Sequence, residues 1–200
     1  MIKIAVTGNI GSGKTTICGI IKNLGFKVFE SDQEVKEILE EKEQIQSLLK
    51  EFHLKIPGLI NNNKIDKEKL GDFVFSNPTE LKKLENLIHP KVWKRKEEFL
   101  LKHKNEKLIF FDVPILFEKK LENNFDFIIY TKISKDIQKQ RVLKRKNMNE
   151  KKFNLITMSQ NILTAQQKKL ISLELETSSD ESKIELLIRN FLKKIQDGKK

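Results

Sequence analysis

The sequence predicts an α/β protein in which helices cover both faces of a central parallel sheet, giving three layers. Short apolar runs typical of buried strands, of which residues 108–117 (LIFFDVPILF) are the clearest, alternate with longer segments of helical periodicity. This alternation is characteristic of βαβ units, whose crossover connections make neighbouring strands parallel. In addition, the first apolar run leads directly into a glycine-rich stretch, TGNIGSGKTT at residues 7–16, and then into a predicted helix.

The N-terminal elements begin this pattern. Residues 2–7 (IKIAVT) are predicted to form a central strand, and residues 13–23 a helix that Gly25 ends. A second strand is expected at residues 26–30, followed by a helical pattern over residues 31–52. The remaining predictions, in order, are a loop at 53–64, helices at 67–75 and 79–87, a break at His89-Pro90, a helix at 91–103, strands at 108–117 and 125–132, a polar and basic helix at about 134–167, and an amphipathic helix at 180–195.

Length and composition favour one main globular domain with a small inserted subdomain. The chain has 200 residues, 38% of them hydrophobic. No apolar run approaches the roughly 18 residues of a membrane span, and the first residues lack the features of a secretory signal. Cys18 is the only cysteine, which excludes a disulfide within the chain and a thiolate zinc cluster. We therefore expect a cytoplasmic protein without a membrane partner, in which Cys18 is a packing residue.

The net charge of +11 raises the question of nucleic-acid binding. Lysines are scattered along the whole chain and usually stand beside glutamates, and the thirteen Phe residues lie mostly inside apolar runs. A nucleic-acid surface more often combines clustered arginines with interleaved aromatic residues. The composition therefore favours no nucleic-acid partner.

The glycine-rich stretch has the spacing G-x-x-x-x-G-K-[ST], from Gly8 to Thr15. Its glycines allow tight turns that direct successive N–H groups, together with the positive end of the following helix, toward one phosphate site. In such a loop Lys14 reaches the β- and γ-phosphates, and the hydroxyl of Thr15 can bind Mg²⁺. The residues expected to bind the nucleotide are Gly11, Ser12, Gly13, Lys14, Thr15 and Thr16.

Residues 63–66 spell N-K-x-D, the sequence that reads guanine in GTPases. No apolar strand leads into it, and no D-x-x-G motif occurs in the chain. We interpret this segment as a polar loop in which Asp66 caps the next helix.

Three segments resemble the dephospho-coenzyme A kinase family: GNIGSGKTT at residues 8–16, LIHPKV at 87–92 and DVPILFE at 112–118. The resemblance extends over nearly the whole chain, through NKIDKEKLGDFVF, QRVLKRKN and the later Gln160. It implies a phosphate-loop fold with a core at 1–30, 105–133 and 170–200, a helical substrate-side insertion at about 31–104 and a helical lid at about 134–168. It also implies transfer of the γ-phosphate of ATP to the ribose 3′-hydroxyl of dephospho-coenzyme A, the last step of coenzyme A synthesis.

Two segments depart from the family pattern. The usual D-A-D after the second strand appears as Glu30-Ser31-Asp32, and residues 171–180 replace the usual ending rich in aspartate and asparagine.

The resemblance assigns roles to particular residues. Asp32 would accept the proton of the acceptor hydroxyl, although a helix-capping role is an alternative. Asp112 ends the clearest strand and, with Thr15, would hold Mg²⁺. His89 and Pro114 would bind the acceptor, and a packed or capping histidine is the alternative for His89.

Arg141 and Arg145 stand four residues apart in the predicted lid helix and would share one face. Guanidinium groups suit two-pronged contact with phosphates, and a closing lid would exclude water. Arg141 would then be catalytic and Arg145 would bind ATP. The alternative for both is an exposed basic helix.

Three other functions remain open at this point: a different small-molecule kinase such as a nucleoside monophosphate kinase, a nucleic-acid-associated ATPase, and a nucleotide-binding module without catalysis. If the protein were a nucleic-acid-associated ATPase, DNA or RNA would stimulate its ATP turnover, and this stimulation would depend steeply on salt. A kinase would instead depend on a small acceptor. We expect a monomer or weak oligomer.

Overall fold

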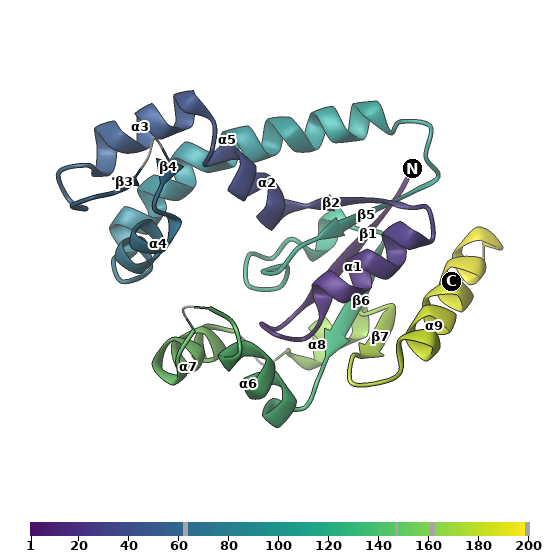
Figure 1. Cartoon of the computed structure of the whole chain (residues 1–200). Helices are drawn as coiled ribbons and strands as arrows, with labels where there is room; N and C mark the ends of the chain where they lie inside the picture. Colours follow the sequence, from purple (N-terminus) through teal and green to yellow (C-terminus); the bar gives the residue numbers. More distant parts are fainter. Residues whose placement is uncertain (62–63, 147, 161–162, 199–200) are drawn as a thin grey trace. The chain divides into compact units, whose positions relative to one another are not determined.

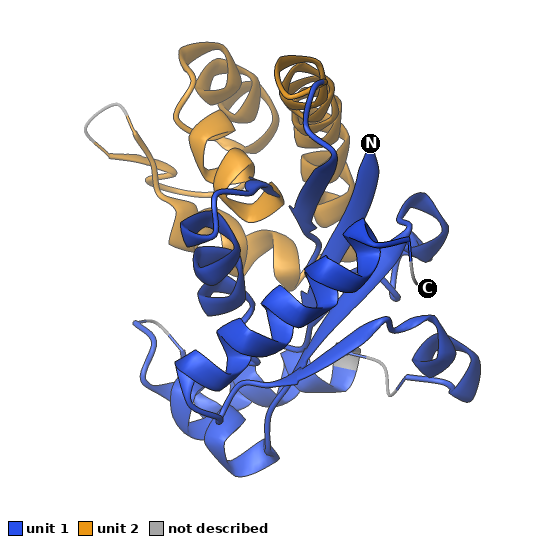
Figure 2. Ribbon diagram, turned by 90° about the vertical axis from the view of Figure 1, so that its right-hand side faces the viewer, with its two compact units in different colours: residues 1–29, 105–200 blue, residues 30–104 orange. Residues whose placement is uncertain are grey.

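The computed structural model describes residues 1–61, 64–146, 148–160 and 163–198 (Figure 1). The chain forms two compact units, which we call unit 1 (residues 1–29 and 105–200) and unit 2 (residues 30–104) (Figure 2). The N-K-x-D segment includes residue 63, which lies outside the described residues. No helix in the described ranges combines the length and the apolar character needed to span a bilayer.

The five-stranded sheet has the order β2-β5-β1-β6-β7. The central strand β1 (Ile2–Gly8) pairs in parallel with β5 (Leu108–Asp112) on one side and β6 (Phe127–Lys132) on the other. The edge strands are β2 (Lys27–Glu30) and β7 (Leu173–Glu176), and β7 is parallel to β6. The predicted central parallel sheet is confirmed.

Helices α1 (Lys14–Asn23) and α9 (Glu181–Gln196) pack on one face of this sheet (Figure 1). Every residue of β5 is buried, so the sheet is covered on both faces. The predicted end of α1 is confirmed, because Gly25 follows the helix with φ +90°. The buried apolar side chains of this face are Ile4, Val6, Ile17, Cys18, Ile20, Ile21, Leu108, Phe110, Ile129, Leu175, Ile184, Ile188, Leu192 and Ile195.

Strand β7 was not predicted from the sequence. It has only four residues, Leu-Glu-Leu-Glu, and pairs with β6 alone. An alternation of apolar and polar residues predicts a half-buried strand, but over only four residues it is a weak signal that other structures also fit.

The predicted helix at 134–167 is wrong. The segment contains α6 (Lys135–Leu143), α7 (Glu150–Ser159) and α8 (Ala165–Leu170). New helices begin where side chains cap them: Asn149 accepts a hydrogen bond from the Lys152 N–H, and Thr164 forms a capping box with Gln167.

This division also corrects the prediction for the lid arginines. Arg141 lies in α6, whereas Arg145 lies beyond its last residue, Leu143. The two arginines therefore do not share a helix face.

Unit 2 is mostly helical. It contains α2 (Ser31–Ile38), α3 (Lys42–Phe52), α4 (Lys67–Phe75) and α5 (Pro78–Lys102), with a short hairpin of β3 (Ile60–Asn61) and β4 (Lys64–Ile65). The capping role of Asp66 is confirmed, because its carboxylate accepts hydrogen bonds from the N–H groups of Glu68 and Lys69. The buried apolar core of this unit is Ile38, Leu39, Leu48, Phe52, Ile56, Leu59, Ile65, Leu70, Val74 and Ile88.

Three predictions for this unit are wrong. The helix expected at 31–52 is divided between α2 and α3, the hairpin of β3 and β4 occupies part of the expected loop, and α5 runs through Pro90 without a break. A proline inside a helix removes one backbone hydrogen bond and clashes with the preceding turn. Here apolar side chains on both sides of Pro90, Leu87 and Val92 among them, pack against the core of unit 2 and favour the continuous helix.

Candidate active site

The phosphate loop joins the C-terminal end of β1 to the first turn of α1. Gly13 has φ +90°, and a Cβ atom there would lie 2.9 Å from the Thr177 Cβ. A Cβ on Gly8 would clash with Thr131. Both glycines are therefore required by backbone conformation and by the close approach of a neighbouring strand end.

The start of α1 is open to an anion. Gly13 is its N-cap and supplies no side-chain hydrogen bond, so the N–H groups of the first turn are not capped by that residue. The Lys14 Nζ donates to the carbonyls of Gly8 (2.7 Å) and Asn9 (3.4 Å), so the ammonium lies over the loop itself. Thr15 and Thr16 are exposed in the same turn. These features together suit the binding of a phosphate group, because uncapped N–H groups, a cation and two exposed threonines occur in one short segment.

A buried hydroxyl chain anchors the loop to β6. The hydroxyls of Ser12 and Thr131 are 2.6 Å apart, and the Thr131 Oγ1 donates to the Thr7 carbonyl at 3.1 Å. All three residues are at most 2% exposed. Because Thr131 donates its proton to Thr7, Ser12 is the donor of the other bond.

Two glutamines from the helical segment after β6 hold the tip of the loop. The Ile10 N–H donates to the Gln160 Oε1 (2.9 Å), and its carbonyl accepts from the Gln138 Nε2 (2.7 Å). Gln138 lies in α6 and Gln160 is the C-cap of α7. Both polar backbone groups of Ile10 are thus bonded to side chains of this segment.

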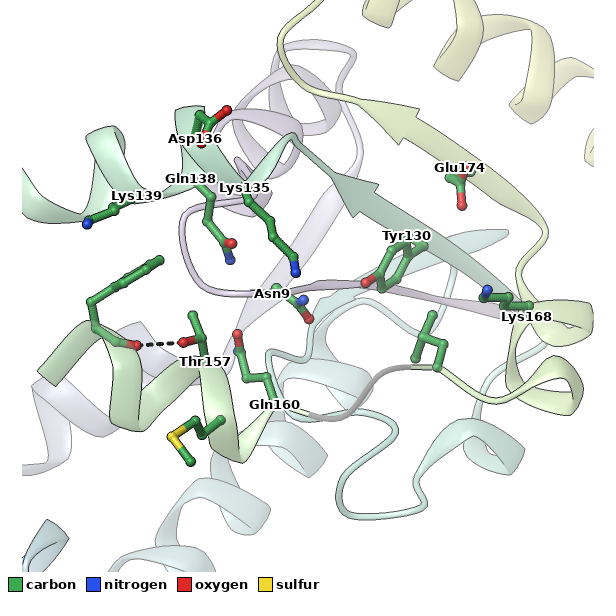
Figure 3. Close-up of a pocket in the computed structure, with 13 residues that line it drawn as sticks. Asn9, Tyr130, Lys135, Asp136, Gln138, Lys139, Thr157, Gln160, Lys168 and Glu174 are labelled. Carbon is green, nitrogen blue, oxygen red and sulfur yellow. Dashed lines mark hydrogen bonds between the residues drawn. The ribbon is translucent and has the colours of Figure 1, made fainter. Parts of the chain in front are cut away.

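A cavity of about 570 Å³ adjoins the loop at Asn9 (Figure 3). Figure 3 shows Lys135 and Gln138 of α6 and Gln160 turned toward the space beside Asn9. Tyr130 of β6 also lines the cavity, and burial raises the pKa of its phenol, with a smaller contribution from nearby carboxylates. The cavity therefore combines an apolar wall with cationic and amide groups next to the phosphate loop.

Arg141 contacts the segment that follows β7. Its Nη1 donates to the Thr177 Oγ1 at 3.2 Å, and its Nη2 donates to the Thr177 carbonyl at 3.0 Å. Thr177 also bonds the phosphate loop, since its Oγ1 donates to the Ser12 carbonyl at 2.7 Å. Thr177 therefore links Arg141 to the loop, whereas Arg145 is exposed beyond α6.

Asp112 is buried at the C-terminal end of β5, opposite Val6 of β1. Parallel strands end at one edge of a sheet, so this carboxylate and the phosphate loop share an edge. Pro114 follows in a half-buried turn.

The residues at this edge fit a magnesium ion. No group of three or more His, Cys, Asp or Glu side chains in the described ranges could hold a metal. Mg²⁺ bound with a nucleotide usually takes few protein ligands, because phosphate oxygens and water complete its coordination. One carboxylate, Asp112, and one hydroxyl, Thr15, suit that arrangement.

The remaining predicted residues belong to unit 2. Asp32 is exposed in the first turn of α2, where the N-cap is Glu30, so the alternative that Asp32 itself is the cap is wrong. His89 is exposed on α5, beside a shallow hollow of about 270 Å³ that Pro90 and Trp93 also line.

A charge network joins α2 to α5 within unit 2. Arg95 of α5 bonds Glu34 (2.8 Å) and Glu37 (3.1 Å) of α2, and also Glu41 (2.7 Å). These hydrogen bonds, that with Glu34 foremost, raise the pKa of Arg95. Hydrogen bonds from Lys91 and then from Arg95 lower the pKa of Glu41. The network therefore links α2, the helix that carries Asp32, to α5.

The model of the dephospho-CoA kinase family matches residues 2–179. The chain belongs to this family. It is 36% identical to the dephospho-CoA kinase of Bartonella quintana, over 78% of this chain and 80% of that protein, and 37% identical to that of Fusobacterium nucleatum, with the same coverage. The family resemblance seen in the sequence is confirmed, and as a family member the chain is an ATP-dependent kinase with a small-molecule substrate.

Several solved structures are similar to the chain. TT1252 from Thermus thermophilus is similar with a TM-score of 0.80 and 26% identity, over 96% of this chain and 97% of that chain. The dephospho-CoA kinase from Campylobacter jejuni has a TM-score of 0.64 and 25% identity, with 98% of both chains covered. A shikimate kinase from Acinetobacter baumannii, at 16% identity and a TM-score of 0.51 over 100% of this chain and 95% of that one, shares the fold.

Sequence reasoning missed three side chains around the phosphate loop of this family member: Gln138, Thr131 and Thr177. All are less than 10% exposed. Thr131 lies near the end of β6, and Thr177 directly follows β7. Polar residues at the C-terminal ends of parallel strands gather at ligand sites, and this signal could have identified both threonines.

Proposed function

We propose that the chain phosphorylates the ribose 3′-hydroxyl of dephospho-CoA with ATP, giving CoA and ADP as the last step of CoA synthesis. The observation that carries this proposal is the family match over residues 2–179, which spans the phosphate loop and the segments that follow it. The phosphate loop alone indicates only a general nucleotide site, because unrelated kinases share the fold. The family match is what makes the proposal specific for this reaction.

The ATP phosphates would bind at residues 11–16. The N–H groups of Gly11, Ser12 and Gly13 and of the first turn of α1 would donate hydrogen bonds to phosphate oxygens. Lys14 would leave its bonds to Gly8 and Asn9 for the β- and γ-phosphates. Thr16 and Arg145, both exposed, would add further contacts to the nucleotide.

Thr15 and Asp112 would hold Mg²⁺. Bound there, the ion would neutralise charge on the phosphates. Support comes from the burial of Asp112 and from its place at the same sheet edge as the loop.

The acceptor would bind at Asp32, His89 and Pro114. The 3′-oxygen attacks the γ-phosphorus, the bond from that phosphorus to the bridging oxygen breaks, and ADP leaves with that oxygen. Asp32 takes the hydroxyl proton. Support for Asp32 is its match to the family's carboxylate motif and its exposed position in the first turn of α2.

Arg141 would stabilise the charge of the transferring group. Phosphoryl transfer needs little covalent work from the protein, so positioned positive charge and water exclusion account for most of the catalysis. The contact of Arg141 with Thr177, which itself contacts the loop, supports a place beside the phosphates.

We extend the proposal to the chain's organisation and setting. Residues 31–104 would form the substrate-side insertion and residues 134–168 the lid, which is supported by the separate core of unit 2 and by the glutamine bonds to Ile10. We also propose that the protein works in the cytoplasm as a monomer or weak oligomer, without nucleic-acid or membrane partners. Scattered lysines paired with glutamates support the absence of a nucleic-acid partner.

The test is ADP formation by the purified protein with Mg·ATP and a panel of acceptors. We expect turnover with dephospho-CoA, little with nucleoside monophosphates, shikimate or DNA, and loss of turnover when EDTA removes the metal. Robust turnover with a nucleoside monophosphate and none with dephospho-CoA would contradict the proposal.

A further inference from the structure

Thr177 contacts both the phosphate loop and Arg141. It is only 7% exposed and follows β7 at the C-terminal edge of the sheet. Its Oγ1 donates to the Ser12 carbonyl at 2.7 Å and lies 3.4 Å from the Lys132 carbonyl. The same oxygen accepts from the Arg141 Nη1 at 3.2 Å, and the backbone carbonyl of Thr177 accepts from Nη2 at 3.0 Å.

The hydroxyl is suited to this position because it can donate and accept at once. It has one proton, which the 2.7 Å bond assigns to Ser12, and lone pairs that remain for the guanidinium. Nη1 and Nη2 contact two oxygens of one residue, so the planar group has a fixed orientation rather than a single flexible contact.

The phosphate loop packs closely against the side chain of Thr177. A Cβ on Gly13 would lie 2.9 Å from both the Cβ and the Oγ1 of Thr177, so only glycine permits the approach. Gly13, Ser12 and Arg141 therefore all meet one threonine, although Arg141 and Thr177 are 36 residues apart in the chain.

We propose that Thr177 is a positioning residue, which holds the guanidinium of Arg141 beside the phosphate loop in the orientation needed for the transferred phosphoryl group. This inference rests on the proposed function of the loop and of Arg141. A long arginine side chain loses rotamer freedom when it binds a ligand, and prior alignment by Thr177 lowers that cost. The remaining N–H groups of Arg141 have no partner among the described residues and are available to phosphate oxygens.

A purely structural role for Thr177 would be to support the loop through Ser12 alone. The two roles differ in their dependence on Arg141. If Thr177 acts through Arg141, removing its hydroxyl has little effect once Arg141 is gone. If it only supports the loop, the two changes act independently and their effects multiply.

The experiment is a double-mutant cycle with Thr177→Val and Arg141→Ala, measured as kcat, as KM for ATP and as ATP affinity. Valine keeps the shape of threonine and removes the hydroxyl. We expect Thr177→Val to lower kcat by about 10-fold, with KM for ATP changed less than 3-fold, and to lower the activity of Arg141→Ala by less than about 2-fold. Thr177→Ser, which keeps the hydroxyl, should restore kcat to within about 2-fold of wild type.

Thr79→Val is the matched control, because Thr79 is exposed in α5 of unit 2. It should leave kcat unchanged. Multiplicative effects in the cycle, or a Thr177→Ser variant as slow as Thr177→Val, would overturn the inference.

Wild-type turnover with dephospho-CoA is measured first, because its absence contradicts the proposed function and not this inference. In that case ATP affinity is the readout of the same cycle. Coupling between Thr177 and Arg141 is still expected there, and independent effects would overturn the inference.

Discussion

Lys14 gives the first test at the scale of one residue. In the structure its ammonium bonds the carbonyls of Gly8 and Asn9, so the cation lies over the loop that we propose binds the phosphates. Lys14→Ala should lower kcat by about 10²-fold or more, comparable to the loss of one electrostatic donor in a catalytic site. Steady-state kinetics with dephospho-CoA is the measurement.

Lys22→Ala is the control for this variant, because Lys22 is exposed at the other end of α1. It should have wild-type kinetics. A folded Lys14→Ala protein with near wild-type turnover would refute the role of Lys14.

Asp32 offers a second test at the scale of one residue. The carboxylate is exposed and is not the N-cap of α2, so Asp32→Asn removes a first-turn charge whose loss costs about 0.3 to 1 kcal/mol. Loss of a general base costs 10² to 10⁴-fold in rate, and we expect about 10²-fold because the transition state is loose. Single-turnover phosphorylation, ATP affinity and Tm are measured together.

The expected result for Asp32→Asn is a slower chemical step, with ATP affinity nearly unchanged and Tm lowered by no more than about 4 °C. If the rate and the stability both remain at wild-type values, Asp32 is not the base.

At the scale of elements, α6 and α7 hold the loop through Ile10. Gln138→Leu keeps the size of the side chain and leaves the Ile10 carbonyl without the amide that now donates to it. We expect kcat/KM for ATP to fall about 5- to 10-fold. The lost hydrogen bond is worth roughly 1 kcal/mol, and its loss weakens both ATP binding and the order of the loop.

Gln140→Leu is the matched control, two residues further along the same helix and exposed. Equal kinetics for the two variants would show that the bond to Ile10 does not matter for nucleotide use.

The charge network of unit 2 gives a prediction about stability. Arg95 bonds three carboxylates, so Arg95→Met should lower the Tm of the protein at pH 7 by about 2 to 4 °C. The pKa of Glu41 is lowered in the folded state, so its contribution is present above the unfolded pKa and is lost as the pH falls through the folded value.

The Tm difference between wild type and Arg95→Met should therefore shrink as the pH is lowered from 6 toward 3. Thermal melts at several pH values and at low and high salt measure this. A difference that is constant with pH would contradict the electrostatic origin.

For the whole molecule, strong local patterns predicted most of the sheet and the loop. The central strands are apolar runs, and the glycine spacing dictates the loop, so β1, β6 and α1 were found near their observed positions. The start of β5 was also found, but the strand ends at Asp112 and the predicted extension to residue 117 is wrong. The break expected at Pro90 was wrong because packing outweighed a local preference.

The contacts of the site were less accessible to sequence reasoning. Thr177 bonds Ser12, which is 165 residues away, and Gln138 bonds Ile10 across 128 residues. No local pattern encodes such pairs, because each joins two segments that are far apart in the chain and meet only in the folded structure. Arg145 was misplaced because α6 ends at Leu143 and a new helix, α7, begins after the cap at Asn149.

The most direct test of the whole account is the identity of the product. The purified protein is incubated with Mg·ATP and dephospho-CoA, and the product is analysed by mass spectrometry and ³¹P NMR. The account predicts CoA, with one added phosphoryl group on the ribose 3′-oxygen, in an amount equal to the ADP formed. ADP formed without CoA, or a phosphoryl group at another position, would contradict it.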